Sequence, residues 1–320
     1  MNIKTLKKES SNFLKRKKAI NETTAKAYKT SLKYFIYYTE NIYLTHEINQ
    51  KNIKHILEGF KGCLNNGLTI TEENKTKTIT FKPSTMNTHI KRVETFLRSL
   101  DFDIKINKYR VNERKYKALS YDQLLLFFSN PEECFKNKEL ALRTQTLIKF
   151  LFNTGFRINE ALNIELENLY TENNNYFVKI HEKGRPKAEL TIIDISKELY
   201  EMLIHYVNNK KYESKYLFSS LKANNEGKAN KLTNKEASKN IIKLSKYIDA
   251  KYNINTYDII KNNSTHVFRH SRAVYLLNIK KCDILEVKEI LRHSNINTTM
   301  LYLNEKEETI KNLRINNDVL

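Results

Sequence analysis

Apolar residues recur every three or four positions along most of this chain, which is the spacing of one face of a helix. The clearest example runs from Thr23 to Glu40, where the apolar positions are Ala25, Tyr28, Leu32, Phe35 and Ile36. Thr23 is a candidate N-cap for this helix. The same periodicity predicts further helices over Lys51–Leu64, Pro83–Leu100, Leu124–Phe128, Glu139–Asn153, Lys197–Asn208, Lys235–Tyr252 and Ile284–Leu291. The pattern therefore predicts a mainly α-helical protein.

Two of these helix starts carry a second signal. Ser120 and Gln123 have the spacing of a capping box, and so do Asp283 and Glu286. In a capping box the two side chains satisfy backbone N–H groups that the first helical turn leaves unpaired. We therefore expect helices to begin at these two places.

One segment departs from the helical period. Between Tyr176 and Ile195, two runs rich in β-branched and aromatic residues flank the turn Lys183-Gly184-Arg185-Pro186. This pattern predicts a β-hairpin with a basic tip. Since only 6 Gly and 3 Pro occur, we expect few other strands. The Thr-rich stretch Thr69–Thr80 is then a polar connection, and Lys222–Lys231 a surface loop.

The periodicity also divides the chain. It stops between Lys105 and Lys117, where charged and polar residues alternate with almost no apolar anchor. We interpret this stretch as a linker between two domains, residues 1–104 and residues 118–320. The last segment, residues 305–320, is too short to form a core of its own. It should dock either on its own domain or on a neighbouring protomer.

The amino-acid composition indicates which kind of binding partner to expect. The chain has a formal net charge of +20 and 40% hydrophobic residues, so it is globular and attracts polyanions, with nucleic acid the first to consider. The three cysteines, Cys63, Cys134 and Cys282, show no spacing typical of a disulfide framework or a zinc site. No apolar run approaches the roughly 20 residues that span a bilayer. We therefore expect a cytoplasmic protein with no membrane association.

The residues that could take part in catalysis are concentrated between Thr265 and Asn304. This stretch contains His266, Arg269, His293 and Tyr302, and upstream Arg157 follows a glycine at a predicted helix start. Two arginines can hold one phosphate, and the phenol can attack it. The set therefore suits attack on a phosphodiester. We find no P-loop and no convincing cluster of carboxylates, so neither a nucleotide cofactor nor a metal is expected.

Five ordered segments carry a family resemblance: Thr154–Leu162, Glu182–Gly184, His266–His270, Leu291–Ser294 and Tyr302. They resemble the motifs of the tyrosine recombinase/integrase family, and most closely those of bacterial Xer-type enzymes. The resemblance spans about Leu119 to Asn304. It implies a helical core-binding domain followed by a mixed α/β catalytic domain with a small antiparallel sheet or hairpin.

The resemblance also implies roles for single residues. Tyr302 would attack the phosphorus and form a 3′-phosphotyrosyl link, while Arg157 and Arg269 would hold the nonbridging oxygens. His293 would donate to the phosphate, and His266 would assist there or help to deprotonate the tyrosine.

On the hairpin tip, Lys183 would protonate the leaving 5′-oxygen, with Lys179, Arg185 and Lys187 as alternatives for that task. Arg185 and Lys187 are also candidate contacts with DNA. The basic face of the Pro83–Leu100 helix supplies two more, Lys91 and Arg92.

The implied function is site-specific recombination without cofactors, in which a homotetramer on double-stranded DNA exchanges strands through a Holliday junction. The task would be chromosome dimer resolution or movement of a mobile element, and a regulating DNA translocase is a further possible partner. Two alternatives remain open: a type IB topoisomerase, and a DNA-binding protein that does not cleave.

Two residues need separate interpretation. Arg292 precedes His293, where the family commonly has glycine. The larger side chain would alter the local backbone or contact DNA. Glu160 follows Arg157 by three positions, and we expect it to order Arg157 or a neighbouring cation rather than take part in the chemistry.

Overall fold

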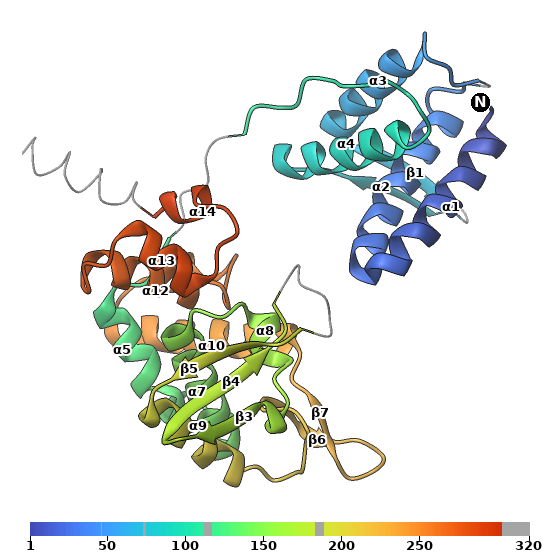
Figure 1. The fold of residues 1–320 in the computed structure, drawn as a ribbon. Helices are drawn as coiled ribbons and strands as arrows, with labels where there is room; N and C mark the ends of the chain where they lie inside the picture. Colours follow the sequence, from blue (N-terminus) through green and yellow to red (C-terminus); the bar gives the residue numbers. More distant parts are fainter. Residues whose placement is uncertain (46, 73–74, 112–116, 183–188, 303–320) are drawn as a thin grey trace, which may run out of the picture. The chain divides into compact units, whose positions relative to one another are not determined.

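The computed structural model describes residues 1–45, 47–72, 75–111, 117–182 and 189–302. The chain forms two compact units, Met1–Arg114 and Lys115–Leu320 (Figure 1). Both are rich in helix, and the strands form small antiparallel sheets, as the sequence predicts. Within the described residues, no helix combines the length and apolar character needed to cross a membrane.

The N-terminal unit is built around four helices: α1 (Ile3–Ile20), α2 (Glu22–Asn41), α3 (Ile53–Asn66) and α4 (Pro83–Arg98). Their apolar stripes meet in one core, where Phe35, Phe60 and Phe96 are fully buried. The predicted helix over Thr23–Glu40 is confirmed as α2. Its N-cap is Asn21, whose side chain accepts from the Thr24 N–H, so the assignment of Thr23 as the cap is wrong.

The Thr-rich stretch between α3 and α4 is a hairpin, not the polar connection that we expected. Strand β1 (Leu68–Glu72) pairs antiparallel with β2 (Lys75–Ile79). The hydroxyls of Thr69 and Thr78 lie 2.9 Å apart across the two strands. Threonine is β-branched and packs well on a pleated surface, so its polarity misled the prediction.

The start of the predicted linker packs on the N-terminal unit. Ile106 is buried, and its N–H donates to Glu94 Oε1 at 3.0 Å. The Tyr109 hydroxyl donates to the Lys61 carbonyl at 2.9 Å. These contacts extend the N-terminal unit beyond residue 104, while residues 112–116 lie outside the described part of the chain.

The second unit consists of a helical body with a three-stranded sheet. Its helices are α5 (Tyr121–Ser129), α6 (Pro131–Cys134), α7 (Lys138–Thr154), α8 (Ile158–Leu162), α9 (Lys197–Asn208), α10 (Asn234–Tyr252), α11 (Tyr257–Ile260), α12 (Val267–Asn278), α13 (Ile284–Leu291) and α14 (Asn297–Met300), and a 3₁₀ turn covers Leu166–Asn168. The capping boxes predicted at Ser120 and Asp283 are both present.

The sheet has the strand order β3 (Leu169–Glu172), β4 (Asn175–Ile180) and β5 (Thr191–Ile195), all antiparallel. The predicted hairpin is confirmed as β4 and β5, but β3 extends it. Val178 and Ile180, two positions apart on β4, both point into the core that α7 and α9 share. In Figure 1 the sheet lies in front of these helices.

A second hairpin corrects the expected surface loop at Lys222–Lys231. Strand β6 (Ser219–Ala223) pairs with β7 (Ala229–Lys231) through a bulged register. The turn between them contains Gly227 at φ 75°, a conformation that glycine adopts without strain. The backbone therefore forms a hairpin although the stretch looks polar throughout.

One tight junction positions the candidate site. Helix α7 ends at Gly155, which has φ 63° and ψ 19°, and the chain then turns into α8. A β-carbon at Gly155 would lie 2.5 Å from Leu291 Cδ2, at the end of α13. The α7–α8 turn and the end of α13 thus approach each other as closely as backbone glycine permits.

Gly155→Ala should therefore destabilise the protein by more than backbone strain alone. A left-handed alanine costs roughly 1–2 kcal/mol, and overpacking against Leu291 adds about 1–3 kcal/mol. Gly227→Ala is the matched control, because it has φ 75° and no heavy atom within 4 Å of the added carbon. Urea unfolding of the full chain measures both variants, and equal losses would contradict the close approach.

Candidate active site

Arg157 lies at the junction between α7 and α8, where it is the N-cap of α8. Its Nη1 donates to Glu160 Oε1 at 2.8 Å, and its backbone N–H donates to Glu160 Oε2 at 2.8 Å. The Glu160 side chain is 4% exposed and that of Arg157 is 29% exposed. Glu160 therefore orients Arg157, as expected from the sequence, and leaves the guanidinium reachable from solvent.

Arg269 is placed in the first turn of α12 and is 4% exposed. Its Nη1 donates to the Gly155 carbonyl and its Nη2 donates to the Leu291 carbonyl. Burial, with Arg157 as the next cause, lowers the pKa of Arg269 to about 10. The group still carries its charge at neutral pH. Arg157 and Arg269, far apart in the sequence, are thus brought to the same junction.

Tyr302 is buried beside α12. Its hydroxyl lies 2.6 Å from His270 Nδ1, and its ring stacks at 6.4 Å from that of His293. Sequence reasoning gave His270 no role, although it follows Arg269 directly. The Asn263 Nδ2 group contacts His270 Nε2 at 3.0 Å. Since an amide nitrogen donates, the neutral imidazole carries its proton on Nδ1 and donates it to the Tyr302 oxygen.

The two histidines that the sequence predicts for the site, His266 and His293, lie close to the His270–Tyr302 pair. His293 is 6% exposed, and its Nδ1 lies 2.8 Å from Thr299 Oγ1. Burial first, and then the nearby Arg269, lower its pKa to about 3, so the ring is neutral at pH 7. His266 precedes α12 and is partly exposed, and its carbonyl accepts from the His270 N–H.

Arg292 adds a third guanidinium to the site. It ends α13 in the left-handed conformation, at φ 55° and ψ 50°. Its side chain stacks on Phe156 at 4.5 Å and forms ion pairs with Glu160 at 3.5 Å and with Glu182 at 3.3 Å. This left-handed conformation is the one that glycine favours at the end of a helix, so it gives no sign of the altered backbone that we expected from the larger side chain.

Three predicted residues, Lys183, Arg185 and Lys187, lie outside the described residues. Glu182, directly before them, ends the described part of that segment. Among the described residues, no group of three or more His, Cys, Asp or Glu side chains is placed to hold a metal ion.

The candidate DNA contacts Lys91 and Arg92 line a groove of about 630 Å³ in the N-terminal unit, between α2 and α4. Lys91 is exposed. The Arg92 Nη1 group donates to the Ala27 carbonyl at 3.3 Å, so part of this guanidinium is engaged within the unit. Lys108 lines the same groove. The groove is therefore basic, and Lys91 is more exposed than Arg92.

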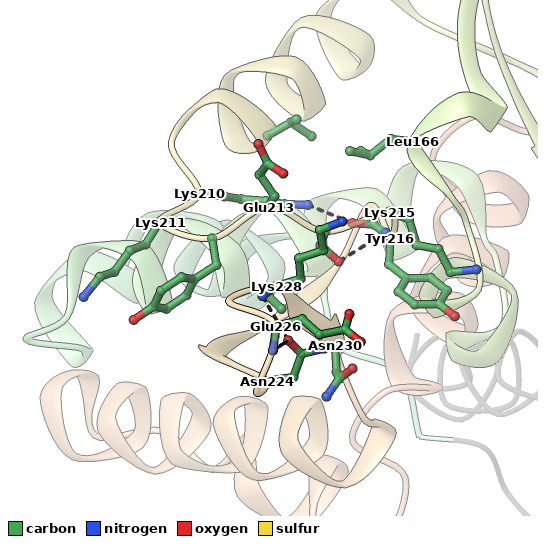
Figure 2. Close-up of a pocket in the computed structure, with 14 residues that line it drawn as sticks. Leu166, Lys210, Lys211, Glu213, Lys215, Tyr216, Asn224, Glu226, Lys228 and Asn230 are labelled. Carbon is green, nitrogen blue, oxygen red and sulfur yellow. Dashed lines mark hydrogen bonds between the residues drawn. The ribbon is translucent and has the colours of Figure 1, made fainter.

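The second unit has a hollow of about 750 Å³ (Figure 2). Its lining mixes lysines with Glu213 and Glu226. The Lys210 ammonium donates to the Tyr216 carbonyl at 2.8 Å, and burial lowers its pKa to about 8. None of the candidate catalytic residues lines this hollow, so its shape does not bear on the phosphodiester chemistry.

Comparison with known proteins identifies the class. Residues 117–309 match the model of the phage integrase family. The match covers more than half of the chain, so the chain belongs to the phage integrase family. The protein is accordingly a tyrosine recombinase, an enzyme that transfers DNA strands.

Relatives of similar length support this assignment. The tyrosine recombinase XerC of Rickettsia prowazekii (strain Madrid E) is 25% identical over 314 residues, which are 94% of this chain and 92% of the relative. The tyrosine recombinase XerD of Staphylococcus haemolyticus (strain JCSC1435) is 26% identical over 316 residues, 97% of each chain.

Solved structures share the fold. The XerH site-specific recombinase, bound to palindromic difH substrate in a post-cleavage complex, aligns with a TM-score of 0.64 and 19% identity over 91% of this chain and 79% of its own. The Tn1549 transposon integrase in complex with transposon right end DNA aligns with a TM-score of 0.66 and 15% identity over 98% of this chain and 100% of its own. The predicted tyrosine recombinase fold is confirmed.

The buried histidine beside Tyr302 should make stability depend on pH. Burial and the neighbouring His266 lower the His270 pKa from 6.5 to about 4. Between these values the unfolded state binds more protons, so the free energy of unfolding falls as the pH falls, by about 1.4 kcal/mol per pH unit for one such group. His270→Asn should reduce this slope in urea unfolding between pH 6 and 4.5.

His205→Asn, which changes an exposed histidine on α9, controls for the loss of a ring as such. An unchanged slope in His270→Asn would show that the ring by Tyr302 is not kept neutral by the fold.

Proposed function

We propose that Tyr302 attacks a DNA phosphate held by Arg157 and Arg269 and forms a 3′-phosphotyrosyl link, which a 5′-hydroxyl then resolves. The observation that carries the proposal is the junction at Gly155, which brings both arginines to one place, with Tyr302 and two histidines packed against it. Guanidinium groups aimed at a phosphate stabilise the charge that develops in the transition state.

Two neighbours of Tyr302 would stabilise the anion that attack requires. A phenol has a pKa of about 10, so its ionisation at neutral pH needs help. The His270 Nδ1–H points at the oxygen, and a hydrogen bond to the phenolate is stronger than one to the phenol. Arg269 is close enough to interact electrostatically with the tyrosine. His266 is then the candidate to receive the proton, and His293 to contact the phosphate.

Lys183 is proposed as the general acid for the leaving 5′-oxygen. Its support is the sequence order Glu182-Lys183-Gly184 after strand β4. Transesterification keeps the energy of the phosphodiester in the protein link, so rejoining needs no nucleotide. Arg185 and Lys187, further along the same segment, are proposed as contacts with the DNA backbone.

The biological task proposed is site-specific recombination on double-stranded DNA in the cytoplasm, through a Holliday junction. Its support is the similarity over nearly full length to relatives named XerC and XerD. A homotetramer on synapsed DNA follows from pairwise strand exchange. We further propose a DNA translocase as regulator, and docking of segment 305–320, which lies outside the described residues, on a neighbouring protomer.

The N-terminal unit is proposed as the core-binding domain. Its groove between α2 and α4 presents Lys91, Arg92 and Lys108, and the whole chain carries a net charge of +20. Neutralising phosphates releases counterions, so binding should weaken steeply as salt rises. Joined to the catalytic domain, this unit would hold the second side of the duplex.

Tyr302→Phe removes one oxygen and should abolish the covalent adduct while DNA affinity persists. The measurement is a protein–DNA band that resists denaturant, formed on fragments of the source genome. Sequencing the DNA in the wild-type adducts maps the cleaved site. Tyr275→Phe, a partly buried tyrosine of α12, is the matched control and should form adducts. An adduct with Tyr302→Phe would identify another nucleophile, and relaxation of plasmids that lack the mapped site would favour a topoisomerase.

Lys183→Ala should be rescued by a substrate with a bridging 5′-sulfur, because a thiolate leaves without a proton. On the normal oxygen substrate we expect a loss of about 10²–10⁴-fold in the cleavage rate, the usual contribution of a general acid. Arg157→Ala is the control, since its loss should persist on both substrates. Equal deficits of Lys183→Ala on oxygen and sulfur would reassign the lysine to binding.

A further inference from the structure

Arg292 joins three parts of the catalytic site through its side chain. It stacks on Phe156 in the α7–α8 turn and forms an ion pair with Glu160 in α8. Its Nε also lies 3.3 Å from Glu182 Oε1, after strand β4, with side chains 13% and 14% exposed. A charged side chain so placed has lost most of its hydration, and its two carboxylate partners are what compensate it.

The two carboxylates would oppose phosphate binding if they were not neutralised. Glu160 is 4% exposed and already accepts from Arg157. Coulomb interactions are strong where water is excluded, so a buried carboxylate weakens the positive potential of each neighbouring guanidinium. Counting only the charged groups named here, Arg157, Arg269 and Arg292 against Glu160 and Glu182 leave a net charge of +1. Without Arg292 the sum is zero.

We propose that Arg292 is a positioning residue that neutralises Glu160 and Glu182, so that Arg157 and Arg269 present their full positive charge to the DNA phosphate. The proposal rests on the proposed function, which places the reacting phosphate at these two arginines. Arg292 need not touch the phosphate itself. Its effect is to prevent the carboxylates from competing with the phosphate for the catalytic cations.

The backbone conformation at Arg292 allows the charge to be removed without adding strain. The residue has φ 55°, where an arginine is slightly strained and a glycine is not, so Arg292→Gly removes the charge without adding backbone strain. Arg292→Gln keeps the aliphatic stem of the side chain and a polar end, but removes the charge and the guanidinium that stacks on Phe156. Arg292→Lys keeps the charge but loses the planar fork. The matched control is Lys281→Gly, which removes an exposed lysine at φ 58°.

The first measurement is the single-turnover rate of adduct formation on a nicked duplex carrying the site mapped with the wild-type protein. Arg292→Gln and Arg292→Gly should both be slower by about tenfold or more, less than the loss for a direct oxyanion donor. Arg292→Lys should be nearer to wild type, and Lys281→Gly should match it. Adding Glu182→Gln to Arg292→Gln should recover much of the rate, because it removes the negative charge of one of the two carboxylates that pair with Arg292.

A second measurement separates charge from structure. A methylphosphonate at the cleaved position removes the negative charge on the nonbridging oxygens, so the deficit of Arg292→Gln should shrink on that substrate. A role limited to holding α13 would give the same deficit on both substrates and no recovery with Glu182→Gln, and this would overturn the proposal. Wild-type speed in Arg292→Gln would overturn it as well. Failure of the wild-type protein to form any adduct would instead refute the proposed function.

Discussion

The buried guanidinium of Arg269 is the constraint on which the catalytic unit depends. It spans from the Gly155 carbonyl, where α7 ends, to the Leu291 carbonyl, where α13 ends. Both carbonyls belong to helix ends, where the helix itself supplies no N–H partner. One side chain thus satisfies two helix termini and holds them together. Because Gly155 has no room for a β-carbon beside Leu291, this junction admits little displacement.

Burial at this junction also determines the protonation state of the two histidines beside Tyr302. Taking the imidazoles of His270 and His293 out of water lowers their pKa values to about 4 and about 3, and the neighbouring arginines act in the same direction. Neutral rings can donate a hydrogen bond to an oxygen without placing another positive charge beside the buried arginines. Arg157, Arg269 and Arg292 therefore carry positive charge beside two neutral imidazoles, and Glu160 fixes the direction of the most exposed of these arginines, Arg157.

Much of this architecture was predictable from the sequence, but not the contacts between distant residues. Helix periodicity and capping boxes are local signals, so α2, α4, α7, α9 and α10 were placed within a few residues. The hairpins at β1–β2 and β6–β7 were missed because threonine, asparagine and lysine suggest loops. The spacing of Arg269, His293 and Tyr302 correctly predicted that these three residues lie close together. The contact between His270 and Tyr302 depends on how α12 packs, which no local pattern encodes, although a second histidine directly after Arg269 was a usable signal.

The position of Tyr302 bears directly on the attack that we propose for it. In-line attack requires the phenol oxygen within about 3–3.5 Å of phosphorus, yet the tyrosine is 4% exposed and its hydroxyl is bound to His270. The segment that carries it is the short helix α14 (Asn297–Met300), fastened through the Thr299 contact with His293. A four-residue helix has little cooperative stability of its own. Moving this segment would break few hydrogen bonds within the short helix, but it would cost the burial of Tyr302 and its contact with His270. The proposed attack by Tyr302 therefore requires these contacts to be exchanged, while Arg269 keeps its two bonds at the Gly155 junction.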